Sequence, residues 1–81
     1  MITAAQIRAA RALLRWSSQE LSKQAGLSLP TIQRMESAEG VPSSYRKNVE
    51  SVQNALAKAG IIFIEGEKNG LIGVALMNKN S

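Results

Sequence analysis

The stretch Ser17–Glu36, which reads SSQELSKQAGLSLPTIQRME, constrains the fold most strongly. Its helix-starting and helix-ending residues predict two short helices joined by a tight turn. Ser17 can cap the first helix, and Glu20 can complete a capping box with it. Gly26 ends this helix, since glycine accepts the left-handed backbone of a helix C-terminus at little cost. Ser28 then caps the second helix. The stretch is therefore predicted to form two helices that cross steeply.

The spacing of apolar residues predicts which side of this helical pair is buried. Pro30 lies in the first turn of the second helix, where its missing N–H is not needed. Ser22 is small at the position where the two helices would come closest. The predicted buried residues recur at helical spacing or close the corner between the helices: Leu21, Ala25, Leu27, Ile32 and Met35.

The remaining side chains of the second helix point away from this core and predict a DNA-reading surface. Gln and Arg side chains can reach base edges in the major groove, and apolar groups can meet thymine methyl groups. The alternative is an ordinary helical hairpin whose solvated face happens to carry Gln33 and Arg34. Together with the start of the first helix, the predicted DNA-binding residues of this stretch are Ser17, Ser18, Gln19, Ser28, Leu29, Pro30, Thr31, Gln33, Arg34 and Ser37.

At these residues the chain resembles the Cro/C1-type (Xre) helix-turn-helix transcriptional regulators, in particular their small stand-alone members. The resemblance covers about residues 3–60 and is most specific over AGLSLPTIQRME. It implies a mainly α fold, namely a four-helix lambda-repressor-like DNA-binding bundle, and repression by occlusion of a promoter. The chain departs from the family at Ser18, where a DNA-contacting Gln is frequent, and at Ser22, where Ala is usual.

Positive charge is concentrated in the part of the chain that is predicted to be helical. The formal net charge of the chain is +4. Residues 1–60 hold eight basic and four acidic side chains, whereas residues 61–81 hold two of each. A basic surface is the electrostatic footprint that a phosphate backbone requires, although charge alone is equally compatible with a merely solvated surface.

A helix over residues 3–15 is predicted to precede the central pair, with Thr3 and Gln6 as its capping box. Its arginines either approach the DNA backbone or are simply solvated. Trp16 is predicted to pack as the hydrophobic staple of the next helix. The buried stripe of the first helix is predicted to be Ile7, Ala10, Leu13 and Leu14, and its basic side Arg8, Arg11 and Arg15.

After a loop over residues 37–44, a fourth helix is predicted at about residues 44–59, capped by Ser43 or Ser44. Arg46 and Lys47 would lie in its first turn, the unfavourable end of the helix dipole for a cation. A DNA phosphate at this helix start would explain them, so both are predicted DNA-binding residues. Tyr45 either adds a hydroxyl contact or packs on the bundle. The buried stripe is predicted to be Val49, Val52, Leu56 and Ala59.

Beyond Gly60 the chain changes to a β-hairpin pattern, in which IIFIE and LIGVALM are strands around a turn near residues 66–70. Both strands are almost continuously apolar, which predicts burial on both faces. A lone two-stranded hairpin is marginal in water and its edges invite pairing. We therefore expect a DNA-binding domain over 1–60 and a dimerisation element over 61–81, with dimer contacts from Ile61, Ile62, Phe63, Ile64, Leu71, Ile72, Val74 and Leu76.

Several functional classes are disfavoured by composition. The chain has neither Cys nor His, and it also lacks Asp and a glycine-rich phosphate loop, so an enzyme, a metal site or a bound cofactor is not expected. No apolar run is long enough for a membrane span and no secretory signal begins the chain, which favours the cytoplasm.

The sequence therefore predicts a homodimeric, sequence-specific regulator that binds a near-palindromic double-stranded DNA operator, and the resemblance implies that it is a repressor. The alternative is an antitoxin or bridging-type interaction module whose hairpin binds another protein. The partner of the hairpin distinguishes the two.

Overall fold

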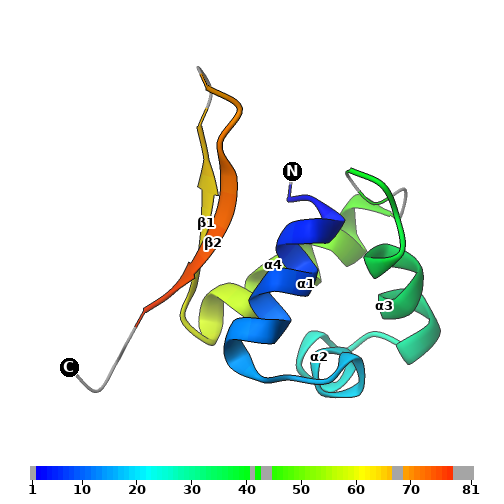
Figure 1. Cartoon of the computed structure of the whole chain (residues 1–81). Helices are drawn as coiled ribbons and strands as arrows, with labels where there is room; N and C mark the ends of the chain where they lie inside the picture. The colour runs from blue at the N-terminus through cyan, green and yellow to red at the C-terminus, as the bar shows by residue number, and fades with distance from the viewer. Residues whose placement is uncertain (1, 41, 43–44, 67–68, 78–81) are drawn as a thin grey trace.

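The computed structural model of the chain describes residues 2–40, 42, 45–66 and 69–77. Within them, four helices are followed by an antiparallel β-hairpin, which confirms the predicted mainly helical fold (Figure 1). No helix in these ranges is both long and apolar enough to cross a membrane. The elements are α1 (Ala4–Leu14), α2 (Ser18–Ala25), α3 (Leu29–Glu36), α4 (Arg46–Lys58), β1 (Ile61–Glu65) and β2 (Ile72–Leu76).

Local capping signals determine where the first two helices begin and end. Thr3 and Gln6 form the predicted capping box of α1, in which each side chain bonds the other residue's backbone N–H. The Ser17 hydroxyl accepts the N–H of Glu20 and caps α2. The predicted second half of that box is wrong, because the Glu20 carboxylate instead accepts a hydrogen bond from the Gln24 side chain at 2.8 Å. Gly26 ends α2 with φ of 69°, as predicted.

The later helices differ in how their first turns are capped. The Ser28 hydroxyl accepts the N–H of Thr31, and a proline lies in the first turn of α3, as predicted. The predicted α4 caps, Ser43 and Ser44, lie outside the described residues. In the described part, Tyr45 precedes α4 and makes no side-chain hydrogen bond to its first turn.

The core lies where the four helices and the inner face of the hairpin meet. Most of the predicted stripe residues of α2, α3 and α4 are buried, but Ala25 and Leu27 are half-buried against the core, and Ala59 is half-buried without belonging to it. On α1, Ile7 and Ala10 are buried and Leu14 packs on the core as predicted, but the prediction is wrong for Leu13, which is 45% exposed because it lies off the face that those residues share. Trp16 packs against the core, as predicted for a staple. The core cluster comprises Ile2, Ile7, Ala10, Leu21, Ile32, Met35, Val49, Val52, Leu56 and Ile61.

The hairpin packs on the helical layer that α1 and α4 form, whereas α3 packs on α1 and α2. Figure 1 accordingly shows the hairpin and α3 on opposite sides of α1. Gln6 anchors the hairpin, because its buried Nε2 donates to the backbone carbonyls of Ile64 at 3.3 Å and Gly73 at 3.0 Å. These two residues are cross-strand partners, so one amide holds both strands.

Candidate nucleic-acid interface

Helix α3 separates a buried side from an exposed polar side. Ile32 and Met35 are each only 1% exposed and fasten the helix to the core. Gln33 and Arg34 are exposed on the opposite side, and Ser37, just beyond the helix, is exposed as well. An Arg can donate two hydrogen bonds to the major-groove acceptors of guanine, and a Gln can form two hydrogen bonds with adenine. This side of α3 therefore has the chemistry to read base edges.

At its first turn, α3 presents smaller groups. Pro30 is exposed and Leu29 is half-buried. The hydroxyls of Ser28 and Thr31 hydrogen-bond each other at 2.8 Å, so each is held in one orientation. The exposed polar strip of α3 is therefore formed by Gln33, Arg34 and Ser37, with Pro30 and Ser28 exposed at the start of the helix, whereas Leu29 and Thr31 are half-buried.

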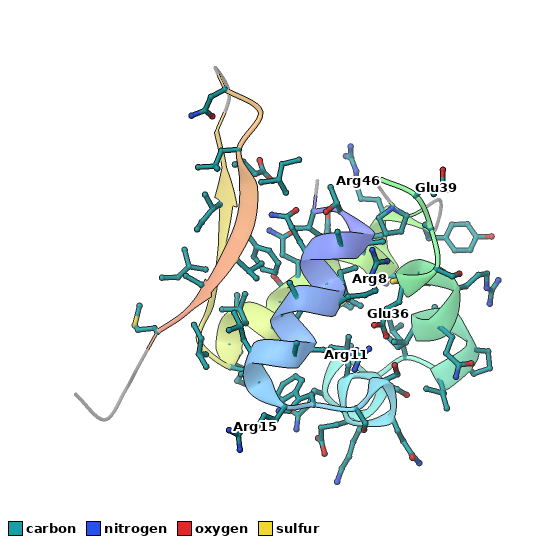
Figure 2. All side chains as sticks on the ribbon, viewed as in Figure 1. Arg8, Arg11, Arg15, Glu36, Glu39 and Arg46 are labelled. Atoms are coloured by element: carbon teal, nitrogen blue, oxygen red, sulfur yellow. The ribbon has the colours of Figure 1, made fainter. Side chains whose placement is uncertain are left out.

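A network of polar groups around Glu36 fixes α3 against the two preceding helices. Oε2 of Glu36 accepts from Nε of Arg11 at 2.7 Å, and Oε1 accepts from the Ser18 hydroxyl at 2.9 Å. Arg11 also donates from Nη1 to the backbone carbonyl of Trp16 at 2.8 Å, and Arg8 donates to the backbone carbonyl of Glu36. Figure 2 shows Arg8 and Arg11 pointing from α1 towards Glu36. One carboxylate thus joins α1, α2 and α3.

This network changes the interpretation of Arg8, Arg11 and Ser18. Arg8 and Arg11 had two predicted roles, at the DNA backbone or in solvent, but both make internal hydrogen bonds, and the Arg11 side chain is only 24% exposed. Arg15 is exposed, as a solvated arginine would be. Ser18, predicted to bind DNA, directs its hydroxyl to Glu36.

Glu36 itself was missed as a structural centre, although the sequence carries a signal for it. A carboxylate in the last turn of a helix is opposed by the negative end of the helix dipole. Its position there requires a compensating cation, in the same way that Arg46 and Lys47 at a helix start require an anion. Which of the arginines would supply that cation depends on how α1 crosses α3, and local sequence does not contain that information.

The beginnings of α2 and α4 flank α3 with exposed polar groups. Gln19 is exposed at the start of α2, next to Ser17. Arg46 and Lys47 are exposed in the first turn of α4, which contains no acidic residue. Tyr45 is 83% exposed, so the predicted alternative of packing on the bundle is wrong. These groups are available to a phosphate.

The eight residues predicted for dimerisation do not share one surface. Ile61 is 4% exposed and belongs to the core of its own chain, and Phe63 and Val74 pack against that core. The others are exposed within the single chain: Ile62, Ile64, Leu71, Ile72 and Leu76.

A comparison with known protein families places a helix-turn-helix within this structure. Residues 7–45 match the family model described as helix-turn-helix. The match covers most of α1, all of α2 and α3, and the residues between α3 and α4. No curated protein matches the chain.

Proposed function

Because the chain belongs to the Cro/C1-type helix-turn-helix family of DNA-binding regulators, we propose that it is a sequence-specific repressor that binds a near-palindromic operator as a homodimer. The observation that carries the proposal is the exposed polar strip of α3. Its Gln33 and Arg34 side chains are presented to solvent by a helix whose other side is buried and locked through Glu36. The proposed role is regulatory and not catalytic, and the cytoplasm is the compartment proposed for it.

In the proposed complex, α3 lies in the major groove and the flanking helix starts hold the DNA backbone. Arg46 and Lys47 contact one phosphate at the beginning of α4, and Ser17 and Gln19 approach another at the beginning of α2. These contacts position the protein without reading sequence. Base discrimination then rests on Arg34 and Gln33, with Leu29, Pro30 and Thr31 beside them.

The homodimer of the proposal is built by edge pairing of two hairpins. A two-stranded sheet leaves edges that invite another strand, and pairing two copies gives a four-stranded sheet. A two-fold axis perpendicular to this sheet leaves both α3 helices on the same side of it, because α3 lies across α1 from the hairpin (Figure 1). Two helices on one side can enter successive major grooves, about 34–36 Å apart.

A second function is favoured by the exposed apolar side chains of the hairpin. Ile62, Leu71 and Ile72 are 46%, 57% and 57% exposed. An antitoxin or bridging-type module would cover them with a different protein. Light scattering on the isolated chain separates the two: a discrete dimer supports the repressor, and a monomer or an ill-defined aggregate supports the interaction module.

Selection of bound sequences from random duplex DNA tests the proposal directly. We expect an enriched site with two related half-sites, whose centres are about one helical turn apart. Enrichment of a single half-site would retain DNA reading and overturn the homodimer. No enrichment at all, from protein that is shown to be folded, would overturn the DNA-binding function.

A further inference from the structure

The first turn of α3 differs in chemistry from the exposed polar strip that follows it. Pro30 is exposed in this turn, and Leu29 and Thr31 beside it are half-buried. The Ser28 hydroxyl accepts the N–H of Thr31 at 3.3 Å and lies 2.8 Å from the Thr31 hydroxyl. One of the two hydroxyl hydrogens is therefore spent between these side chains. The turn thus presents a rigid apolar ring with little free hydrogen-bonding capacity around it.

The same turn is poorly suited to a DNA phosphate. The start of a helix binds an anion through the amide groups that its first turn leaves unpaired. In α3 the nitrogen of Pro30 carries no hydrogen, and the N–H of Thr31 is taken by Ser28. The turn contains no basic residue either, in contrast to the start of α4. If α3 enters a DNA duplex by its first turn, the surface that this turn can contact is therefore the edge of a base.

Thymine is the base whose major-groove edge matches such a turn. It carries a methyl group on C5, whereas adenine and guanine present polar atoms and cytosine presents its amino group. A proline ring set against a polar atom would displace water from it and return no hydrogen bond, which is unfavourable. Set against a methyl group, the ring buries apolar surface on both partners. The chemistry of Pro30 therefore favours thymine.

The position of Pro30 relative to Arg34 gives the thymine a place in the half-site. The two exposed residues are four positions apart, so they lie on one side of α3 and about 6 Å apart along its axis. Adjacent base pairs are about 3.4 Å apart. We propose that each half-site contains a thymine whose methyl group contacts Pro30, about two base pairs from the guanine that Arg34 reads. This inference rests on the proposed function and deepens it, because it names a group of the operator that is read without a hydrogen bond.

A contact of this kind depends on the methyl group and not on the base pair that carries it. Uracil pairs with adenine as thymine does, but it lacks the methyl group. 5-Methylcytosine carries the same methyl group on a base that pairs with guanine. Replacement of the thymine by 5-methylcytosine should therefore retain more binding than replacement by cytosine, so methylation of cytosine at this position would strengthen binding.

Four operators that differ at a single position of each half-site test the inference. The position is located by replacing each thymine of the selected operator by uracil in turn, and it then carries thymine, uracil, 5-methylcytosine or cytosine. Binding titrations measure the four affinities. We expect removal of the methyl group to weaken binding by about fourfold for each half-site changed, both from thymine to uracil and from 5-methylcytosine to cytosine.

Pro30→Ala assigns the methyl contact to the proline ring. Alanine is compatible with the first turn of a helix and leaves the Ser28 cap in place, and thermal unfolding checks that the variant is folded. This variant should bind the thymine and uracil operators almost equally. Leu13→Ala, which shortens an exposed apolar side chain on α1, is the matched control and should keep the full methyl effect.

The other outcomes separate this inference from the proposed function. Equal affinity of the unmodified chain for thymine and uracil at every position would overturn the inference and leave the proposed function intact. A methyl effect that persists undiminished in Pro30→Ala, or that lies far from the base pair at which Arg34→Ala relaxes the preference, would also overturn it. Failure of the folded chain to select any duplex would overturn the proposed function, and the inference with it.

Discussion

Glu36 is the residue on which the placement of α3 depends most. Its side chain is 8% exposed and lies at the end of the helix that the dipole makes unfavourable for a carboxylate. Arg11 and Ser18 compensate for both costs by donating to its two oxygens. Once one donor is removed, the carboxylate keeps its desolvation cost but loses part of its compensation.

Arg11→Met should therefore destabilise the fold by about 3 kcal/mol, because it leaves a buried charge unpaired. Thermal or urea unfolding measures the loss. The double variant Arg11→Met, Glu36→Gln removes that charge as well and should recover part of the loss. If the double variant were as unstable as the sum of its single changes, the two residues would not be coupled and this account of Glu36 would be wrong.

Arg34 carries the prediction for base reading. Arg34→Ala should cost about 1–3 kcal/mol on the selected operator and relax the preference at one base pair. Arg34→Lys is the control, because it keeps the charge but lacks the two-pronged grip on guanine. Binding titrations on the operator and on single-base variants measure both effects. An equal loss on every duplex would make Arg34 a phosphate contact.

At the scale of elements, local signals in the sequence predicted the helices and strands well. Thr3, Ser17, Ser28 and Gly26 act through bonds or backbone angles a few residues away, so their effects could be read without the fold. The exposure of Leu13 and the network around Glu36 could not, because they depend on how helices cross. The hairpin was predicted as an element, but its docking through Gln6 was not.

At the start of α4, Arg46 and Lys47 are predicted to contact a phosphate of the DNA backbone. Arg46→Ala or Lys47→Ala should weaken binding to every duplex and reduce the slope of log affinity against log salt by about 0.9. Lys58→Ala, an exposed lysine at the far end of α4, is the control and should leave the slope unchanged. An unchanged slope in both test variants would show that neither side chain contacts a DNA phosphate.

Docking of the hairpin depends on the Gln6 amide. Gln6→Glu can still accept the Thr3 N–H, but it sets a carboxylate against the carbonyls of Ile64 and Gly73 in place of a donor. We expect a loss of about 2 kcal/mol or more in unfolding free energy. Gln19→Glu makes the same change at an exposed site and should have little effect. Equal stabilities would show that the hairpin is held by apolar packing alone.

At the scale of the whole molecule, the hairpin serves the core as well as any partner. Ile61 is buried in the cluster that the helices form, and Phe63 and Val74 pack on it. The sequence predicted burial on both faces of the hairpin. In the single chain only Ile61, Phe63 and Val74 are covered by the helices, whereas Ile72 and Leu76 on the same face, and Ile62 and Ile64 on the other, are exposed. A sequence alone does not say which alternate residues point inward.

A chain that ends at Gly60 should consequently lose stability together with any dimer. Burial of a side chain such as Ile61 is worth about 1.5–3 kcal/mol, and two further apolar contacts would be lost with it. Circular dichroism during urea unfolding measures the loss, and sedimentation measures the mass. A truncated chain as stable as the full one would show that the helices form a complete core without the hairpin.

The Gln6 amide also sets an order of events during synthesis. Its oxygen completes the cap at the start of α1, while its nitrogen bonds residues 58 and 67 positions later in the chain. While β2 is still inside the ribosome, this nitrogen lacks its two carbonyl partners, and the side of α1 on which β2 packs is uncovered. Helix α1 therefore reaches its final packing only after β2 has left the ribosome, so α1 and the hairpin complete their folding together.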